Sequence, residues 1–249
     1  MLGSGAVNAR LPISIFALAA AVLLVPFASP KGAGDAEPIA HAKEQHAHGH
    51  GERPAYQRRF DDAEKWAQLF DDPTRQEWQK PDEVIEKMRL APGMVVADIG
   101  AGTGYFLSYL SKAVGEEGKV WGVDIEPTLI EYMSKRIGRE GLGNAKAVLA
   151  EPDDPKLEMG SVDRVLIVNT WHHISNRVNY GKKLFAMLKR DGAIYLVDYT
   201  KESPRGPPKE HRMPPEELKA ELGRAGFEME IVEESLSYQY MVVGRKPGE

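Results

Sequence analysis

The chain contains no cysteine, and it has no excess of basic charge. Without a thiol there can be no disulfide, thiolate metal site, cysteine nucleophile or lipid-modified cysteine. The 32 Lys and Arg residues against 37 Asp and Glu give a formal net charge of −5, so no global positive field attracts nucleic acid. The remaining composition, 42% hydrophobic and 28% charged over 249 residues, is typical of one or two folded globular domains.

The amino terminus lacks an apolar run as long as a membrane span. Residues 11–30 carry no charge and follow Arg10, but their apolar core, residues 13–25, is shorter than the roughly 20 residues of a spanning helix. A basic residue before a short apolar segment is typical of a secretory signal peptide, so we predict that residues 1–30 direct export to the periplasm or beyond. An uncleaved membrane anchor through residues 11–28, a mis-assigned start codon and a cytoplasmic location are the alternatives.

Residues 31–54 have little that could be buried, which predicts a disordered linker. Four of the seven histidines lie in it: His41, His46, His48 and His50. A flexible histidine tract of this kind could bind a transition metal ion such as Zn²⁺. A solvated linker with only weak affinity for metal is the alternative.

The most informative stretch is residues 95–106, where an apolar, β-prone segment ends in a carboxylate and three alternating glycines follow. This order predicts a buried strand, a tight turn and the start of a helix. Glycine allows backbone conformations and close approaches that a side chain would prevent, and the helix start offers free N–H groups to a polar ligand. The stretch therefore predicts a nucleotide-like ligand at the carboxyl end of a parallel strand.

The spacing of the glycines and one carboxylate indicate which ligand. The dinucleotide fingerprint is G-x-G-x-x-G, whereas Gly100, Gly102 and Gly104 give G-x-G-x-G. Asp98, two residues before the first glycine, would repel a pyrophosphate but would suit a cationic or amine-bearing ligand. An NAD(P)-dependent oxidoreductase is thus a disfavoured alternative.

These residues resemble motif I of the class I S-adenosylmethionine (SAM)-dependent methyltransferases. SAM carries a sulfonium and an α-amino group and no phosphate. The resemblance covers roughly residues 77–246 and implies a Rossmann-like α/β fold with a seven-stranded, mostly parallel sheet, helices on both faces and an antiparallel last strand. It also implies that SAM is bound by the residues of the motif, namely Asp98, Gly100, Ala101, Gly102 and Gly104.

Further ligand contacts are expected after the second and third strands. Residues 119–124 predict a strand ending in Asp124, twenty residues after Gly104, where an acid accepts hydrogen bonds from ribose hydroxyls. The resemblance implies that Asp124 binds the ribose of SAM and that Ile125 lies against the adenine. It also implies an acidic contact to the adenine amino group after the strand at residues 145–149, from Glu151 or Asp153, although a plain turn is the alternative.

The acceptor end is expected after the apolar run at residues 163–169, which predicts a strand buried on both faces. Asn169 is placed beside the cofactor. Amino-methylating members of the family often have Asn-Pro-Pro-Tyr here, whereas this chain has Asn-Thr-Trp-His. Its pair of adjacent histidines resembles small-molecule methyltransferases of the ubiquinone-biosynthesis type. Either His172 or His173 could act as the base toward the acceptor, because histidine titrates in the right range. The alternative is that one is packed and the other bonds the backbone.

We therefore predict a helical lid over residues 55–92 and a SAM-binding methyltransferase domain over residues 93–249, acting on a small molecule. A non-catalytic exported protein that binds metal or cofactor is the second hypothesis. The sequence gives no prediction of oligomeric state. Outside the motifs, periodicity predicts helices at residues 62–70, 83–90, 106–114, 127–139, 177–188 and 216–223, and strands at 193–198, 228–234 and 237–244.

Overall fold

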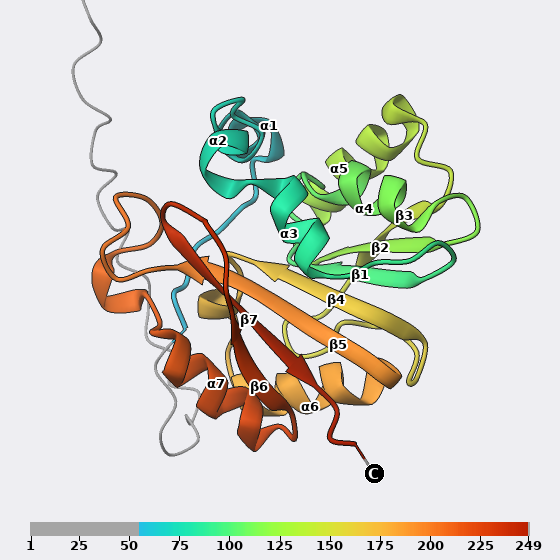
Figure 1. Ribbon diagram of the computed structural model, residues 1–249. Coiled ribbons are helices and arrows are strands. Elements are labelled where there is room, and N and C mark those ends of the chain that lie inside the picture. Colours follow the sequence, from blue (N-terminus) through green and yellow to red (C-terminus); the bar gives the residue numbers. More distant parts are fainter. Residues whose placement is uncertain (1–54, 249) are drawn as a thin grey trace, which may run out of the picture. The chain divides into compact units, whose positions relative to one another are not determined.

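A seven-stranded sheet in the order β3-β2-β1-β4-β5-β7-β6 forms the centre of the protein (Figure 1). The computed structural model describes residues 55–248. Their elements, in chain order, are α1 (Ala63–Phe70), α2 (Arg75–Gln79), α3 (Pro81–Lys87), β1 (Val95–Ile99), α4 (Leu107–Val114), β2 (Lys119–Asp124), α5 (Pro127–Glu140), β3 (Ala145–Leu149), β4 (Val162–Val168), η1 (Trp171–His173), α6 (Arg177–Met187), β5 (Leu188–Tyr199), η2 (Lys209–His211), α7 (Pro215–Arg224), β6 (Glu228–Val232) and β7 (Gln239–Arg245).

The pairing of the strands shows where the carboxyl ends of the parallel strands lie. Strands β3, β2, β1, β4 and β5 pair in parallel, whereas β7 is antiparallel to both β5 and β6. The carboxyl ends of the parallel strands therefore meet at the same edge, where open α/β sheets bind their ligands. The predicted fold, a mostly parallel Rossmann-like sheet with an antiparallel last strand, is confirmed.

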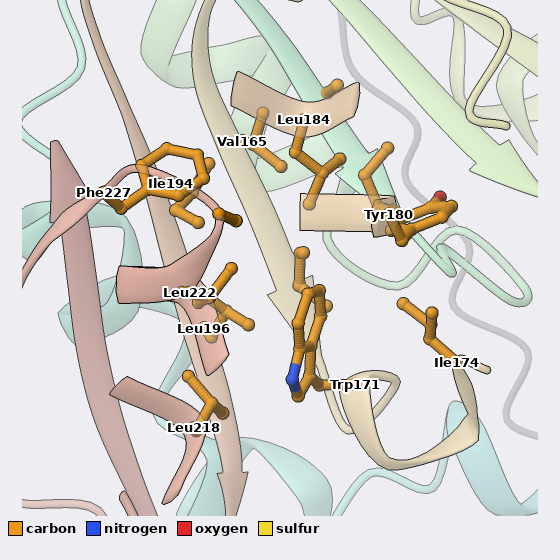
Figure 2. Packing of buried hydrophobic residues seen from close by; sticks show 14 of the residues in the cluster. Val165, Trp171, Ile174, Tyr180, Leu184, Ile194, Leu196, Leu218, Leu222 and Phe227 are labelled. Atoms are coloured by element: carbon orange, nitrogen blue, oxygen red, sulfur yellow. The ribbon is translucent and has the colours of Figure 1, made fainter. Parts of the chain in front are cut away.

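Helices cover both faces of the sheet because its central strands are apolar on both faces. On one face α3, α4 and α5 contribute to a core that includes Val84, Leu107 and Met133. On the other, α6 and α7 pack with the 3₁₀ turn η1, and Figure 2 shows Trp171 among Leu184, Leu196 and Leu222. Both layers keep the edge of the sheet fixed beneath the loops that follow its strands.

Two predictions about elements need correction. The five-residue helix α2 was not predicted, because so short a segment shows no apolar periodicity. The strand expected at residues 193–198 is longer than predicted, because β5 already begins at Leu188. Val162 pairs with Leu188 and Arg164 with Ala193, so an irregularity in the register absorbs the additional residues of β5.

The predicted signal peptide or anchor and the histidine-rich linker lie outside the residues that the structure describes. Within residues 55–248, no helix is long and apolar enough to cross a membrane. The predicted lid, residues 55–92, belongs to the same compact unit as the sheet.

Candidate functional site

A cavity of about 440 Å³ lies at the carboxyl ends of the parallel strands. That volume is within the range of sites that enclose small ligands, roughly 300–1,000 Å³. Its walls are formed by the glycine turn after β1, by the loops after β2, β3, β4 and β5, by Tyr180 of α6 and by the segment from Tyr56 to Trp78. Of the residues predicted to bind or react, the following line it: Gly100, Ala101, Gly102, Asp124, Ile125, Asn169, His172 and His173.

The turn after β1 needs glycine because of its backbone conformation and, at Gly100, because of a close neighbour. Gly100 and Gly102 have φ of 71° and 58°, a region that residues with a Cβ rarely adopt. A Cβ on Gly100 would lie 2.3 Å from Thr170 Cγ2, which leaves no room for a side chain, whereas one on Gly102 would make an ordinary contact of 3.4 Å with Phe70 of the lid. The amide of Gly102 donates to Asp124 Oδ2 at 2.8 Å, so the turn after β1 is fixed to the end of β2.

Gly104 and Asp98 belong to the same motif but do not line the cavity. A Cβ on Gly104 would lie 2.9 Å from Leu107 Cδ1 and 3.0 Å from Met133 Cγ, so this glycine allows close packing of α4 and α5. Asp98 is 2% exposed. Burial raises its pKa from 3.8 to about 7, although the Arg75 charge opposes the shift.

Arg75, the first residue of α2, brings a positive charge to the wall of the cavity that sequence reasoning did not find. Its Nη1 donates to Phe70 O at 2.7 Å, and its guanidinium carbon lies 3.9 Å from the centre of the Tyr105 ring. Its buried Nε has no hydrogen-bond partner among the described residues. A lone arginine in an unpredicted helix carries no motif, so only the fold could reveal this residue.

The carboxylate at the end of β2 is buried and bonded to backbone amides. Asp124 is buried and accepts from the amides of Gly102 and Glu126 at 2.8 and 3.1 Å. Burial raises the pKa of Asp124, and these backbone bonds oppose the increase. Ile125 follows it on the cavity wall and is half exposed.

The two candidate adenine contacts lie on the surface beside the cavity. Glu151 pairs with Lys156 at 2.9 Å, and Asp153 lies 3.5 Å from Lys183. Neither lines the cavity, whose wall in this loop is made by Ala150 and Pro152. The adenine contact of Glu151 or Asp153 stays a prediction.

The adjacent histidines have distinct environments. His172 is buried, and its Nδ1 lies 3.0 Å from each carboxylate oxygen of Asp198, at the end of β5. His173 Nδ1 lies 2.5 Å from the carbonyl oxygen of Tyr56. Burial, together with the neighbouring His172, lowers the pKa of His173 to about 4, which makes it a weak base. The arrangement therefore favours His172 as the proton acceptor.

The four histidines predicted to bind metal, His41, His46, His48 and His50, lie outside the described residues. Within the described part of the chain, no group of three or more His, Asp or Glu side chains is arranged to hold a metal ion.

Comparisons with known proteins agree with this geometry. The family model of a methyltransferase domain matches residues 96–192. A solved SAM-dependent methyltransferase from Aquifex aeolicus is 31% identical, with a TM-score of 0.69 over 74% of this chain and 97% of that one. A protein-L-isoaspartate O-methyltransferase of Methanococcus maripaludis is 32% identical over 46% of this chain and 50% of its own.

A ubiquinone/menaquinone biosynthesis C-methyltransferase of Hydrogenovibrio crunogenus is 25% identical over 50% of this chain and 48% of its own. The chain thus spans about half the length of the curated relatives it matches. The Aquifex structure, in contrast, is matched over 97% of its own length. On these grounds the chain belongs to the SAM-dependent methyltransferases.

Proposed function

We propose that this protein transfers a methyl group from SAM to a small molecule that enters the cavity. The observation that carries the proposal is that the glycine turn and the His172–Asp198 pair meet at one cavity. When bound, SAM supplies a methyl group on a positively charged sulfur. Methyl transfer needs the acceptor to be held in line with that group, so positioning within an enclosed site contributes much of the catalysis.

The residues around the glycine turn suit the functional groups of SAM. The unpaired Nε of Arg75 is a donor for the methionine carboxylate. Asp98 and Asp124 are acids suited to the ammonium group and the ribose hydroxyls. A pyrophosphate at the same turn would be repelled by the charge of Asp98, which lies at the end of β1 just before the turn, and this disfavours an NAD(P)-dependent enzyme.

The covering of the acceptor end favours a small acceptor over a protein. The amide of Tyr56 donates to His172 O at 2.7 Å, and the carbonyl of Tyr56 contacts His173 Nδ1. The Tyr56 ring also lies 4.8 Å from that of His211, measured between centroids. A folded protein acceptor would have to displace the segment at Tyr56 before any side chain of the acceptor reached His172.

Isothermal titration of the full chain with SAM, NAD and Zn²⁺ tests the proposal against its rivals. We expect saturable binding of SAM at one site and none of NAD. Binding of NAD in place of SAM would instead support an oxidoreductase. Binding of SAM with no label transferred from a methyl-labelled donor to any molecule of a metabolite extract would support a non-catalytic binding protein.

The affinity for SAM should depend on pH through Asp98. Because the pKa of Asp98 is about 7, its carboxyl group is neutral below that pH and anionic above it. The anion attracts the cationic donor, so affinity should weaken as pH falls through 7, by up to about tenfold per pH unit for one linked proton. The charges that set this pKa besides burial are Arg75, which lowers it, and Asp124, which raises it.

Titration calorimetry across pH 5.5–8.5 (a range of about 1.5 units either side of this pKa) measures the effect. Asp98→Asn should abolish the pH dependence, and the ratio of wild-type to variant affinity removes the titration of the donor's own amino group. Glu158→Gln, in an exposed loop, is the matched control and should retain it. An unchanged slope in Asp98→Asn would assign the dependence to another group.

A further inference from the structure

Four side chains from three distant parts of the chain form a continuous line of hydrogen bonds that ends at the cavity. Arg75 Nη2 donates to Gln79 Oε1 at 3.3 Å, and Gln79 Nε2 donates to Gln239 Oε1 at 2.7 Å. Gln239 Nε2 then donates to Asn169 Oδ1 at 2.6 Å. Gln79 and Gln239 are buried, so neither amide can exchange its partner for bulk water.

The guanidinium at one end sets the direction of the whole line. An arginine has only donors, so Gln79 must turn its carbonyl toward Arg75 and its NH₂ group toward Gln239. Gln239 is oriented in the same sense, and Asn169 must accept with Oδ1. The oxygen and nitrogen of an amide are told apart by their hydrogen-bond network, and here the charged end leaves one choice.

The line therefore leaves the NH₂ group of Asn169 as a donor at the cavity. Asn169 is the first residue after β4; it lines the cavity and has a positive φ of 55°. Its Nδ2 has no hydrogen-bond partner among residues 55–248.

The second fixed group at the same cavity is an acceptor. The Asp198 carboxylate can only accept, so Nδ1–H of His172 donates to it, and in this tautomer Nε2 carries no hydrogen. Asn169 and His172 are three residues apart on the same loop and both line the cavity. The acceptor end thus presents one oriented donor and one oriented proton acceptor.

We infer that the atom methylated is the oxygen of a hydroxyl group, held by the Asn169 NH₂ donor and by Nε2 of His172; this rests on the proposed function. A hydroxyl oxygen donates its hydrogen and accepts another hydrogen bond at the same time. An ammonium nitrogen, the neutral-pH form of an alkylamine, has no lone pair to accept the Asn169 hydrogen. A thiol is only a weak partner on both counts.

The step balances with the residues present and the bound donor. The O–H proton passes to Nε2 of His172 as an oxygen lone pair forms the bond to the methyl carbon. The carbon–sulfur bond breaks with its electron pair left on sulfur, which becomes a neutral thioether. Asp198 stabilises the imidazolium until its proton passes to water, and the Asn169 NH₂ group stabilises negative charge developing on oxygen.

The chemical shift of the transferred carbon tests the inference whatever molecule accepts the methyl group. The full chain is incubated with SAM carrying a carbon-13 methyl group and a low-molecular-weight metabolite extract, and the products are examined by NMR. A signal in the O–CH₃ region is the expected result. An N–CH₃, S–CH₃ or C–CH₃ signal would overturn the inference and leave the proposed function standing, whereas SAM binding without any labelled product would count against the proposed function itself.

A substitution at the buried Gln79 that reverses the orientation of the amides gives a second test. In Gln79→Glu the new carboxylate only accepts, so Gln239 must turn its NH₂ group toward it and offer Oε1 to Asn169. Asn169 then faces the cavity with its own oxygen. Loss of one such donor should lower the rate of O-methylation at saturating SAM about 10²-fold.

Binding of SAM separates this effect from damage to the donor site, because Arg75 still has a partner at position 79. We expect the Kd for SAM in Gln79→Glu to stay within about twofold of wild type, so that the loss falls on kcat. Gln76→Glu, on the exposed side of the same helix, is the matched control and should keep both constants. Asn169→Asp removes the donor directly and applies if the first variant does not fold. Wild-type rates in both Gln79→Glu and Asn169→Asp would contradict the role of the line.

Discussion

Replacing His172 with glutamine is expected to lower kcat about 10²- to 10⁴-fold, the usual contribution of a positioned general base. The Kd for SAM should change little, because His172 is assigned to the acceptor and is not among the residues expected to bind SAM. The reason for the large effect is the pairing with Asp198, whose two oxygens each lie 3.0 Å from Nδ1 and leave Nε2 as the group that takes the proton. Initial rates of methyl transfer and titration with SAM measure the two constants.

The pH dependence distinguishes a lost base from a disturbed structure. Hydroxide in solution replaces a missing base, so the deficit of His172→Gln should shrink as pH approaches the pKa of the acceptor hydroxyl. Asp198→Asn should also be impaired, because an amide can hold the ring in the wrong tautomer. His173→Gln should lower kcat less than about tenfold, since the pKa of His173 near 4 makes it a poor base at neutral pH. A kcat of wild-type size in His172→Gln would remove the catalytic role.

Removing Glu221 is expected to destabilise the protein by about 3–5 kcal/mol, the cost typical of breaking one side of a buried ion pair. Glu221 Oε2 accepts from Arg177 Nε at 2.7 Å, and its Oε1 accepts from Arg177 Nη2 at 2.7 Å. Both side chains are about 1% exposed. Glu221→Ala removes the carboxylate that compensates the Arg177 charge, which water cannot reach.

The same carboxylate holds the turn that carries the histidines. Trp171 Nε1 donates to Glu221 Oε2 at 3.0 Å, and the Trp171 ring lies within the core shown in Figure 2. Loss of Glu221 should therefore loosen His172, the next residue, and lower kcat in protein that remains folded. Urea unfolding followed by far-UV circular dichroism gives the change in free energy, and rates below the transition give the effect on kcat.

Two further variants show whether charge is the cause. Glu216→Ala, on the same helix, breaks an exposed pair with Lys219 and should cost about 0–1 kcal/mol. The double variant Arg177→Met/Glu221→Leu should recover the part of the loss that comes from the uncompensated Arg177 charge, because apolar residues of similar volume can replace a buried pair. The part that comes from the lost acceptor of Trp171 Nε1 should remain. A loss of less than about 1 kcal/mol in Glu221→Ala would show that the pair contributes little.

The cofactor end of the site could be predicted because its residues are neighbours in the sequence. The seven residues from Asp98 to Gly104 contain the strand end, the turn and the approach to the helix, and local rules of backbone conformation apply to all of them. Asp124 could be added because the next strand must end at the same edge of the sheet. The fold was predictable for a similar reason, since continuous apolar runs indicate strands buried on both faces.

The groups that give this motif its chemistry could not be predicted in the same way. Nothing in the sequence near Asp98 indicates the charge of Arg75, and it is mainly burial in the fold that raises the pKa of Asp98 to about 7. Gly104 carries the motif but serves the packing of two helices. The contacts of a residue, and not its place in a motif, decide its function.

By itself the sequence determined a Rossmann-like sheet, a glycine turn suited to SAM and a pair of histidines after the fourth strand. Only the tertiary structure decided which histidine meets a carboxylate and which way an amide points at the acceptor. His172 and Asp198 are 26 residues apart, and Gln79 and Gln239 are 160 apart. Backbone preferences act between neighbours along the chain, whereas these bonds depend on the order of the strands, which brings the carboxyl ends of β4 and β5 beside the start of β7.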